Sequence, residues 1–232
     1  MRAGERKDCC YNRGRLSRST DAPAVRRKGL LLVSGALFLV CALISSLPAA
    51  IEKPGPADVI KRFNSTLLES MKKADELGYR GRYNLLEPII RDSFALSFMA
   101  DQSVGRYWRG LKEEERKAFL KTYTEWTIAT YAARFDGYSG EKFETVSESG
   151  PERGIVTVLS KIIEPEKDSV DFYYKLRKMD NKWLIVDIQM SGVSQLALTR
   201  AQFVSVIKNK GFNNLAAMLR KKIEAFAKGK EQ

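Results

Sequence analysis

The spacing of apolar residues indicates helices in the part of the chain before residue 140. Between residues 57 and 77 they recur at intervals of three and four, which predicts an amphipathic helix that Gly78 should end. Apolar groups over 88–99 predict short helices, the first beginning near Pro88. Residues 112–135 are apolar over a wide arc, so this helix, predicted to be the longest, should contact two layers of the fold.

From residue 142 onward the period of the pattern changes from helical spacing to alternation, which is typical of strands with one wet face. Gly150-Pro151-Glu152 and Asp180-Asn181 have the residue types of turns. The pattern predicts four strands in meander order, at 142–148, 154–163, 169–179 and 182–190.

After the fourth strand, residues 191–194 should break the sheet, because Gly192 accepts backbone angles that other residues avoid. Two amphipathic helices at 198–209 and 213–227 follow, separated by Gly211. Helices, then a meander, then helices predict an α+β domain. We expect helices packed on one face of a curved four-stranded antiparallel sheet, with a C-terminal helical hairpin.

Composition excludes several classes of site. The chain has no histidine, which removes imidazole ligands and every catalytic triad or dyad that uses imidazole as its base. All three cysteines precede residue 50, so no disulfide is expected in the domain that follows. No phosphate-binding loop, dinucleotide motif or metal-ligand spacing is present, and no metal or cofactor is expected.

The net charge of +12 divides evenly, because residues 1–50 hold nine basic and three acidic residues. The remaining +6 is too small to mark a dedicated nucleic-acid-binding protein. The basic residues of the two terminal helices have two readings, an ordinary solvated face or a docking surface for an acidic partner or anionic lipid headgroups.

The first fifty residues have the pattern of an export signal. The basic residues 26–28 precede an uncharged apolar run at 29–44, and small residues near Ala50 offer a cleavage site. The run is also close to the length of a spanning helix, so an uncleaved anchor is the alternative. We expect a tail with signal or anchor at 1–50, a linker at 51–57 and one domain at 58–229.

The C-terminal part of the chain carries a family resemblance. The run KWLIVDIQMSGVSQLALTRAQF, followed by IKNKGFNNLAAML, resembles the C-terminal signature of MlaC-type periplasmic lipid-binding proteins, and most closely their hopanoid-associated HpnM branch. The matching positions are Trp183, Asp187, Gly192, Val193, Ser194, Arg200, Phe203 and Gly211.

The resemblance implies a periplasmic carrier on a cone-shaped, NTF2-like α+β fold, which shields a phospholipid or hopanoid between the inner and outer membranes. Its implied partners are an inner-membrane lipid-transport ABC complex and an outer-membrane lipoprotein complex. Burying each methylene group away from water is worth about 0.8 kcal/mol. An apolar pocket can therefore hold the chains of a lipid that is poorly soluble in water.

We predict the walls of the lipid cavity from aromatic helix faces and strand alternation, although any of these residues can instead be ordinary core. The helical wall is predicted at Phe98, Trp108, Phe119, Tyr123 and Trp126. The sheet wall is predicted at Val156, Val158, Phe172, Tyr174, Val186 and Ile188. Arg200 is a candidate contact for a lipid headgroup or a partner.

Two other functions remain open on the sequence alone. Asp187 is the only acid within the apolar fourth strand, and a desolvated carboxylate with a tyrosine could act as a general base in an NTF2-like enzyme. We favour a structural acid paired with Arg200 or another cation, because structural ion pairs often resemble catalytic sites. The third reading is a membrane-tethered assembly factor without a ligand.

Overall fold

The computed structural model describes residues 53–229, which lie within one compact unit spanning residues 51–232. In this part of the chain, six α-helices and one 3-10 helix accompany a single sheet. The helices are α1 (Pro56–Lys72), α2 (Ala74–Ser93), α3 (Leu96–Val104), the 3-10 helix η1 (Gly105–Gly110), α4 (Glu113–Arg134), α5 (Gln195–Lys210) and α6 (Phe212–Ala227).

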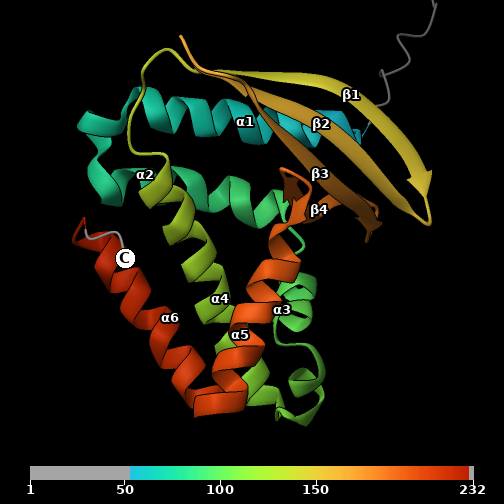
Figure 1. Cartoon of the computed structure of the whole chain (residues 1–232), viewed down its shortest axis with the longest axis vertical. Helices are drawn as coiled ribbons and strands as arrows, with labels where there is room; N and C mark the ends of the chain where they lie inside the picture. The colour runs from blue at the N-terminus through green and yellow to red at the C-terminus, as the bar shows by residue number, and fades with distance from the viewer. Residues whose placement is uncertain (1–52, 230–232) are drawn as a thin grey trace, which may run out of the picture. The chain divides into compact units, whose positions relative to one another are not determined.

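The sheet is antiparallel, and its strands lie in chain order from one edge to the other. The strands are β1 (Lys142–Glu152), β2 (Ile155–Ile163), β3 (Val170–Met179), β4 (Lys182–Met190) and β5 (Val193–Ser194). Figure 1 shows the curved sheet lying over α1, while α4, α5 and α6 extend away from it. The predicted α+β class, meander and C-terminal hairpin are confirmed, with β5 as an additional two-residue strand.

Tight two-residue turns set the register of the meander. Asp180 and Asn181 both have positive φ, of 46° and 64°, which is the geometry of the turns that match strand twist. The turn predicted at Gly150-Pro151-Glu152 is wrong, because β1 continues through these residues and the chain reverses at Arg153-Gly154. The pairing of β1 with β2 shifts register between Ser149 and Glu152, so the glycine and proline lie in an irregularity of the strand.

The first helix breaks earlier than predicted. α1 ends at Lys72, and Gly78 lies inside the next helical stretch with φ 56° and ψ −176°, which interrupts that helix. The buried Arg82 side chain donates to the Ala74 carbonyl (3.0 Å) and to the Ala132 carbonyl (2.9 Å). One side chain therefore satisfies a carbonyl at the start of α2 and one near the end of α4. The break between α1 and α2 at Lys73 contains no glycine or proline that could have predicted it.

The helix predicted to begin at Pro88 does not begin there. Pro88 lies within α2, on an exposed position, and the helix continues to Ser93. At the end of α2 the backbone joins the sheet, because the Ala95 amide donates to the Ile185 carbonyl at 2.9 Å. This bond ties the α2–α3 junction to β4.

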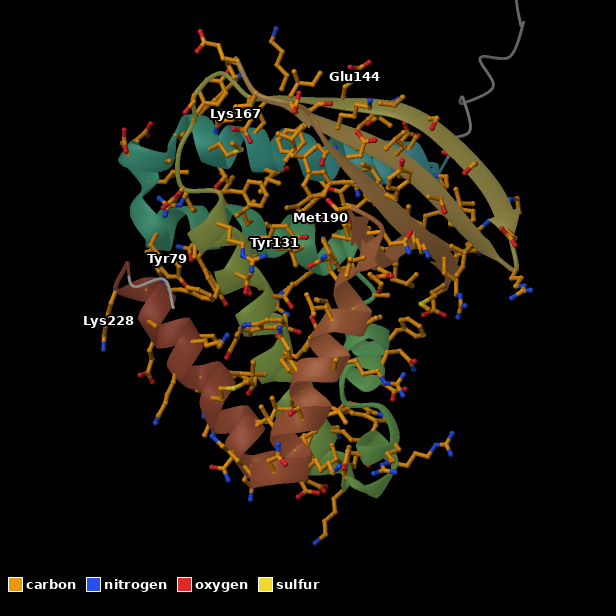
Figure 2. All side chains as sticks on the ribbon, viewed as in Figure 1. Tyr79, Tyr131, Glu144, Lys167, Met190 and Lys228 are labelled. Atoms are coloured by element: carbon orange, nitrogen blue, oxygen red, sulfur yellow. The ribbon has the colours of Figure 1, made fainter. Side chains whose placement is uncertain are left out.

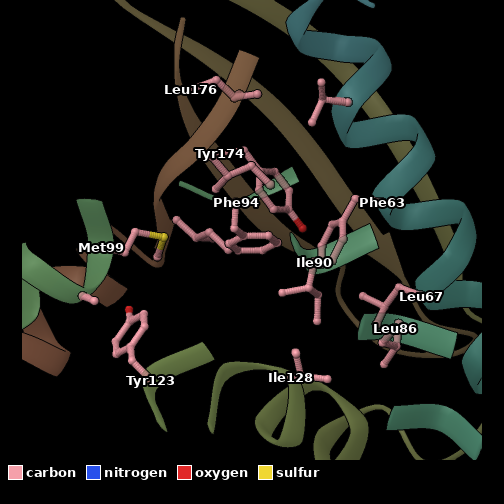
Figure 3. Close-up of a cluster of buried hydrophobic side chains, with 14 of the residues drawn as sticks. Phe63, Leu67, Leu86, Ile90, Phe94, Met99, Tyr123, Ile128, Tyr174 and Leu176 are labelled. Carbon is pink, nitrogen blue, oxygen red and sulfur yellow. The ribbon is translucent and has the colours of Figure 1, made fainter. Parts of the chain in front are cut away.

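The core lies between the sheet and the helices (Figure 3). Fully buried Phe63 and Leu67 come from α1, Leu86 and Ile90 from α2, and Leu176 from β3. Removing a side chain of this kind typically costs about 2–5 kcal/mol, so these contacts fix the position of each layer.

The predicted export signal or anchor, with its cysteines, lies outside the described residues. Within residues 53–229, no helix combines the length and the apolar character needed to cross a membrane. The proposed linker at 51–57 overlaps the start of α1 at Pro56, one residue before the predicted helix start.

Candidate functional site

The aromatic residues of the interior form two groups. The first, which we call the sheet-side cluster, consists of Phe63, Phe94, Tyr131 and Tyr174. The ring centroids of Phe63 lie 5.2 Å from Phe94, 5.4 Å from Tyr131 and 6.2 Å from Tyr174. These residues come from α1, the α2–α3 junction, α4 and β3, so the cluster fills the angle between the sheet and the first helices.

The second group, the hairpin-side cluster, lies between the first half of α4 and the C-terminal hairpin. It consists of Phe119, Tyr123, Trp126, Phe203 and Phe212. Phe119 lies 5.1 Å from Phe212, and Trp126 lies 5.4 Å from Phe203, between ring centroids. The wide apolar face predicted for the long helix therefore contacts two layers, as expected: the hairpin near its start and the sheet-side cluster at Tyr131.

The two clusters belong to one continuous apolar core. The predicted helical-wall residues Trp108, Phe119, Tyr123 and Trp126 join the hairpin side, where Trp108 lies 6.4 Å from Phe119 between ring centroids. Phe98 also packs against this core, and the Arg177 guanidinium lies 5.5 Å from its ring centroid.

The predicted sheet-wall residues Val156, Val158, Tyr174 and Ile188 are buried in the core, and Phe172 packs against it. Val186 is also buried but is not part of this core cluster. The register explains its position, because Lys175 pairs with Asp187 and Leu176 with Ile185, which leaves Val186 as the extra residue of a β-bulge.

Sequence reasoning omitted Ile185, which is fully buried and takes the inward position next to the bulge. It also omitted Phe94, Tyr131 and Phe203 from the wall. Helical periodicity could have selected Tyr131 and Phe203, since both lie on apolar helix faces. Phe94 carries no such signal, because it lies at the junction of two helices.

Three tyrosines place hydroxyl groups in this apolar interior. Desolvation by burial raises the pKa of Tyr123, Tyr131 and Tyr174, so each phenol stays protonated and able to donate a hydrogen bond. The Tyr174 hydroxyl donates to Asn64 Oδ1 at 3.4 Å. Figure 3 shows the Tyr174 hydroxyl on the side of Phe63 and the Tyr123 hydroxyl on the side of Met99.

Asp187 has a structural role in the fold. Its Oδ1 accepts hydrogen bonds from the backbone amides of Ile188 (2.8 Å) and Leu196 (3.1 Å). Leu196 is in the first turn of α5, where backbone donors lack helical partners, and Ser194 Oγ accepts from Ala197 in the same turn at 3.0 Å. Asp187 therefore caps α5 from the end of the sheet, and this arrangement supports the structural reading over a general base.

The predicted pairing of Asp187 with Arg200 is wrong. Among the described residues, Asp187 is in no ion pair. Arg200 is exposed on α5, and its guanidinium lies against Gly105, where a Cβ would come within 2.8 Å of Nη2. Gly105 is the C-terminal cap of α3, an end that favours positive charge. Arg200 thus links α5 to the α3–η1 junction.

Two hollows lie on the surface, away from the aromatic clusters. One of about 510 Å³ lies beside Tyr173 on the outer face of β3, and one of about 390 Å³ lies between α3 and α4 beside Leu120. Neither hollow is lined by a residue of the predicted wall.

Comparison with known proteins finds similarity to a family model, to a curated relative and to a solved structure. A family model described as MlaC protein matches residues 61–221. The intermembrane phospholipid transport system binding protein MlaC of Haemophilus influenzae is 26% identical over 140 residues, which cover 57% of this chain and 65% of that protein. The chain thus matches slightly less than two thirds of the length of this relative.

A solved structure has the same fold. It is a phospholipid-binding protein from Ralstonia solanacearum in complex with a phospholipid, with a TM-score of 0.66 and 18% identity. The match covers 75% of this chain and 99% of that chain. At this identity the likeness establishes the fold alone.

Proposed function

The chain belongs to the MlaC family, and we propose that it is a periplasmic carrier that shields a phospholipid or hopanoid between membranes. The observation that carries the proposal is the aromatic interior, in which the sheet-side cluster under the curved sheet and the hairpin-side cluster between α4 and the C-terminal hairpin belong to one apolar core. The phospholipid-transport name of the Haemophilus relative and the phospholipid in the Ralstonia structure support this class of cargo.

The energetics favour a cargo with long apolar chains. An acyl chain of about 15 methylenes gains about 12 kcal/mol on leaving water, at about 0.8 kcal/mol for each methylene. That gain can offset the apolar contacts that an entering lipid disrupts, because the lipid replaces them. The carrier needs no covalent step, and its mechanism is binding and release.

We assign the lining of the loaded cavity to the predicted wall. The helical side comprises Phe98, Trp108, Phe119, Tyr123 and Trp126. The sheet side comprises Val156, Val158, Phe172, Tyr174 and Ile188, with Ile185 in place of Val186, which lies outside the core cluster. The protonated hydroxyl of Tyr123 suits a lipid ester carbonyl, which needs a neutral donor. Arg200, exposed beside the α3–η1 junction, suits a phosphate headgroup at the opening.

Export and partners are part of the proposal. Residues 1–50 would act as a signal or anchor, and the domain at 58–229 would work in the periplasm. Its proposed partners are an inner-membrane lipid-transport ABC complex and an outer-membrane lipoprotein complex. The engagement of Asp187 in capping α5 supports a role without catalysis.

Photo-crosslinking in cells tests the cavity. The full chain carries p-benzoylphenylalanine at Phe172 or, as a matched control, at the adjacent Tyr173. Phe172 packs against the core, whereas Tyr173 is 36% exposed on the opposite face of β3. We expect a lipid adduct, detected by mass spectrometry of the purified protein, from position 172 and none from position 173.

Two results would contradict the proposal. Equal lipid adducts at both positions would indicate nonspecific contact with a membrane. No adduct at 172, Trp126 or Tyr123, in protein that crosslinks to other proteins, would favour the ligand-free assembly factor.

A further inference from the structure

The positive charge of the described domain is concentrated on its C-terminal hairpin. Residues 53–194 hold 23 basic and 22 acidic residues, which nearly cancel. Residues 195–229 hold seven basic residues against one acid, Glu224, a net charge of +6. We propose that this hairpin is a docking surface for a membrane that carries anionic lipid headgroups.

The charges lie on the outer side of the hairpin. Along α6, Arg220, Lys221 and Lys228 are exposed and share a stripe opposite the fully buried Leu215 and Leu219. The inner face of α6 packs on α4, so the basic stripe faces away from the domain. Figure 2 shows Lys228 projecting outward from the end of α6.

The remaining exposed cations extend this surface to the connection between the two helices. Lys208 and Lys210 are exposed in the last turn of α5, directly before α6 begins. Within residues 53–229, no cation of the hairpin is in an ion pair. Their charge is therefore available to an external partner.

The chemistry of the stripe favours a bilayer over an acidic protein. Five of the seven cations of the hairpin are lysines, which are flexible point charges that impose no fixed geometry on their partner. The stripe on α6 contains Asn213, Ala217 and Glu224 besides its cations, and none of these is the aromatic or large apolar anchor that centres a protein interface. Mobile anionic headgroups are attracted by the positive charge of the stripe and need no such anchor.

This inference does not rest on the proposed cargo, because membrane binding and lipid content are measured separately. The measurement uses residues 51–232, which form one compact unit and match a solved chain over 99% of its length. Thermal unfolding verifies that each variant is folded. Sedimentation with vesicles of phosphatidylcholine, with and without phosphatidylglycerol, then gives the partition coefficient.

We expect binding to vesicles that contain phosphatidylglycerol, no binding to pure phosphatidylcholine, and loss of binding at about 0.5 M salt, where the screening length is only about 4 Å. The triple variant Arg220→Gln/Lys221→Gln/Lys228→Gln should bind roughly 10- to 100-fold more weakly. The matched control removes three exposed cations from the sheet, at Lys142, Arg153 and Lys178, and should change binding by less than about threefold.

Two outcomes would overturn the proposal. Equal losses in the two triple variants would mean that overall charge, and not the hairpin, attracts the vesicles. Absence of any preference for anionic vesicles in the unmodified domain would exclude membrane docking. If the hairpin variant nevertheless abolished the carrier function in cells, the partner of the hairpin would be an acidic protein and not a membrane.

Discussion

Replacing Asp187 by alanine should destabilise the domain by about 2 kcal/mol, because the carboxylate joins the end of the sheet to the start of α5. It accepts from the Leu196 amide at 3.1 Å and the Ile188 amide at 2.8 Å. Removing an N-terminal cap costs about 0.5–2 kcal/mol, and a hydrogen bond to a charged group contributes about 1.5–3 kcal/mol. Because Asp187 is only half-buried, water replaces part of the loss.

Asp187→Asn is the matched variant, since it keeps an acceptor oxygen and should cost less than about 1 kcal/mol. Urea unfolding of residues 51–232 gives both values. For a domain of this size, 2 kcal/mol corresponds to a midpoint shift of about 1 M. Asp187→Asn should also leave the lipid content unchanged, because the residue has no catalytic role in this account.

A double-mutant cycle with Arg200→Ala distinguishes the observed cap from the ion pair that the sequence suggested. Because Arg200 lies against Gly105 and forms no ion pair with Asp187, the coupling energy should be below about 0.5 kcal/mol. A coupling above about 1 kcal/mol, or an Asp187→Ala variant as stable as the unmodified domain, would refute the reasoning.

Two further predictions concern the α3–η1 junction and the buried tyrosines. Gly105→Ala should lower the free energy of unfolding in urea by about 1–3 kcal/mol, because the residue has φ 58° and ψ −129°. Adding Arg200→Ala should not restore stability; if it did, side-chain contact and not backbone strain would set the cost. In a spectrophotometric titration, Tyr123, Tyr131 and Tyr174 should stay protonated above pH 10 until the domain unfolds, since their pKa values are raised in the folded state. Their contribution to stability is then complete below about pH 10 and is lost as the pH rises further. Ionisation of every tyrosine near pH 10 in folded protein would contradict their burial.

The alternation of residues predicted the strands well, and the errors lie where tertiary contacts override local signals. Gly150-Pro151 is a stronger turn signal than Arg153-Gly154, yet pairing with β2 carries β1 past it. The break after Lys72 has no glycine or proline, and the buried Arg82 side chain donates to the Ala74 carbonyl just beyond it. Neither contact is visible in a local pattern.

The predicted cavity wall shows the same limit of prediction from local sequence patterns. Strand alternation placed Val186 and Ile188 on one face, but the bulge at Val186 gives the inward position to Ile185. Aromatic helix faces predicted which residues pack in or against the core. They did not predict two clusters, because the cluster to which a residue belongs depends on where the C-terminal hairpin folds back. Phe203 joins the predicted helical wall only through that return.

The most direct test of the central claim is lipid mass spectrometry on the exported protein. The domain is purified from a host that makes both phospholipids and hopanoids, without detergent, and extracted with organic solvent. The account predicts close to one lipid for each protein, and the class of that lipid decides between phospholipid and hopanoid cargo. Folded protein that carries no lipid would contradict the carrier function.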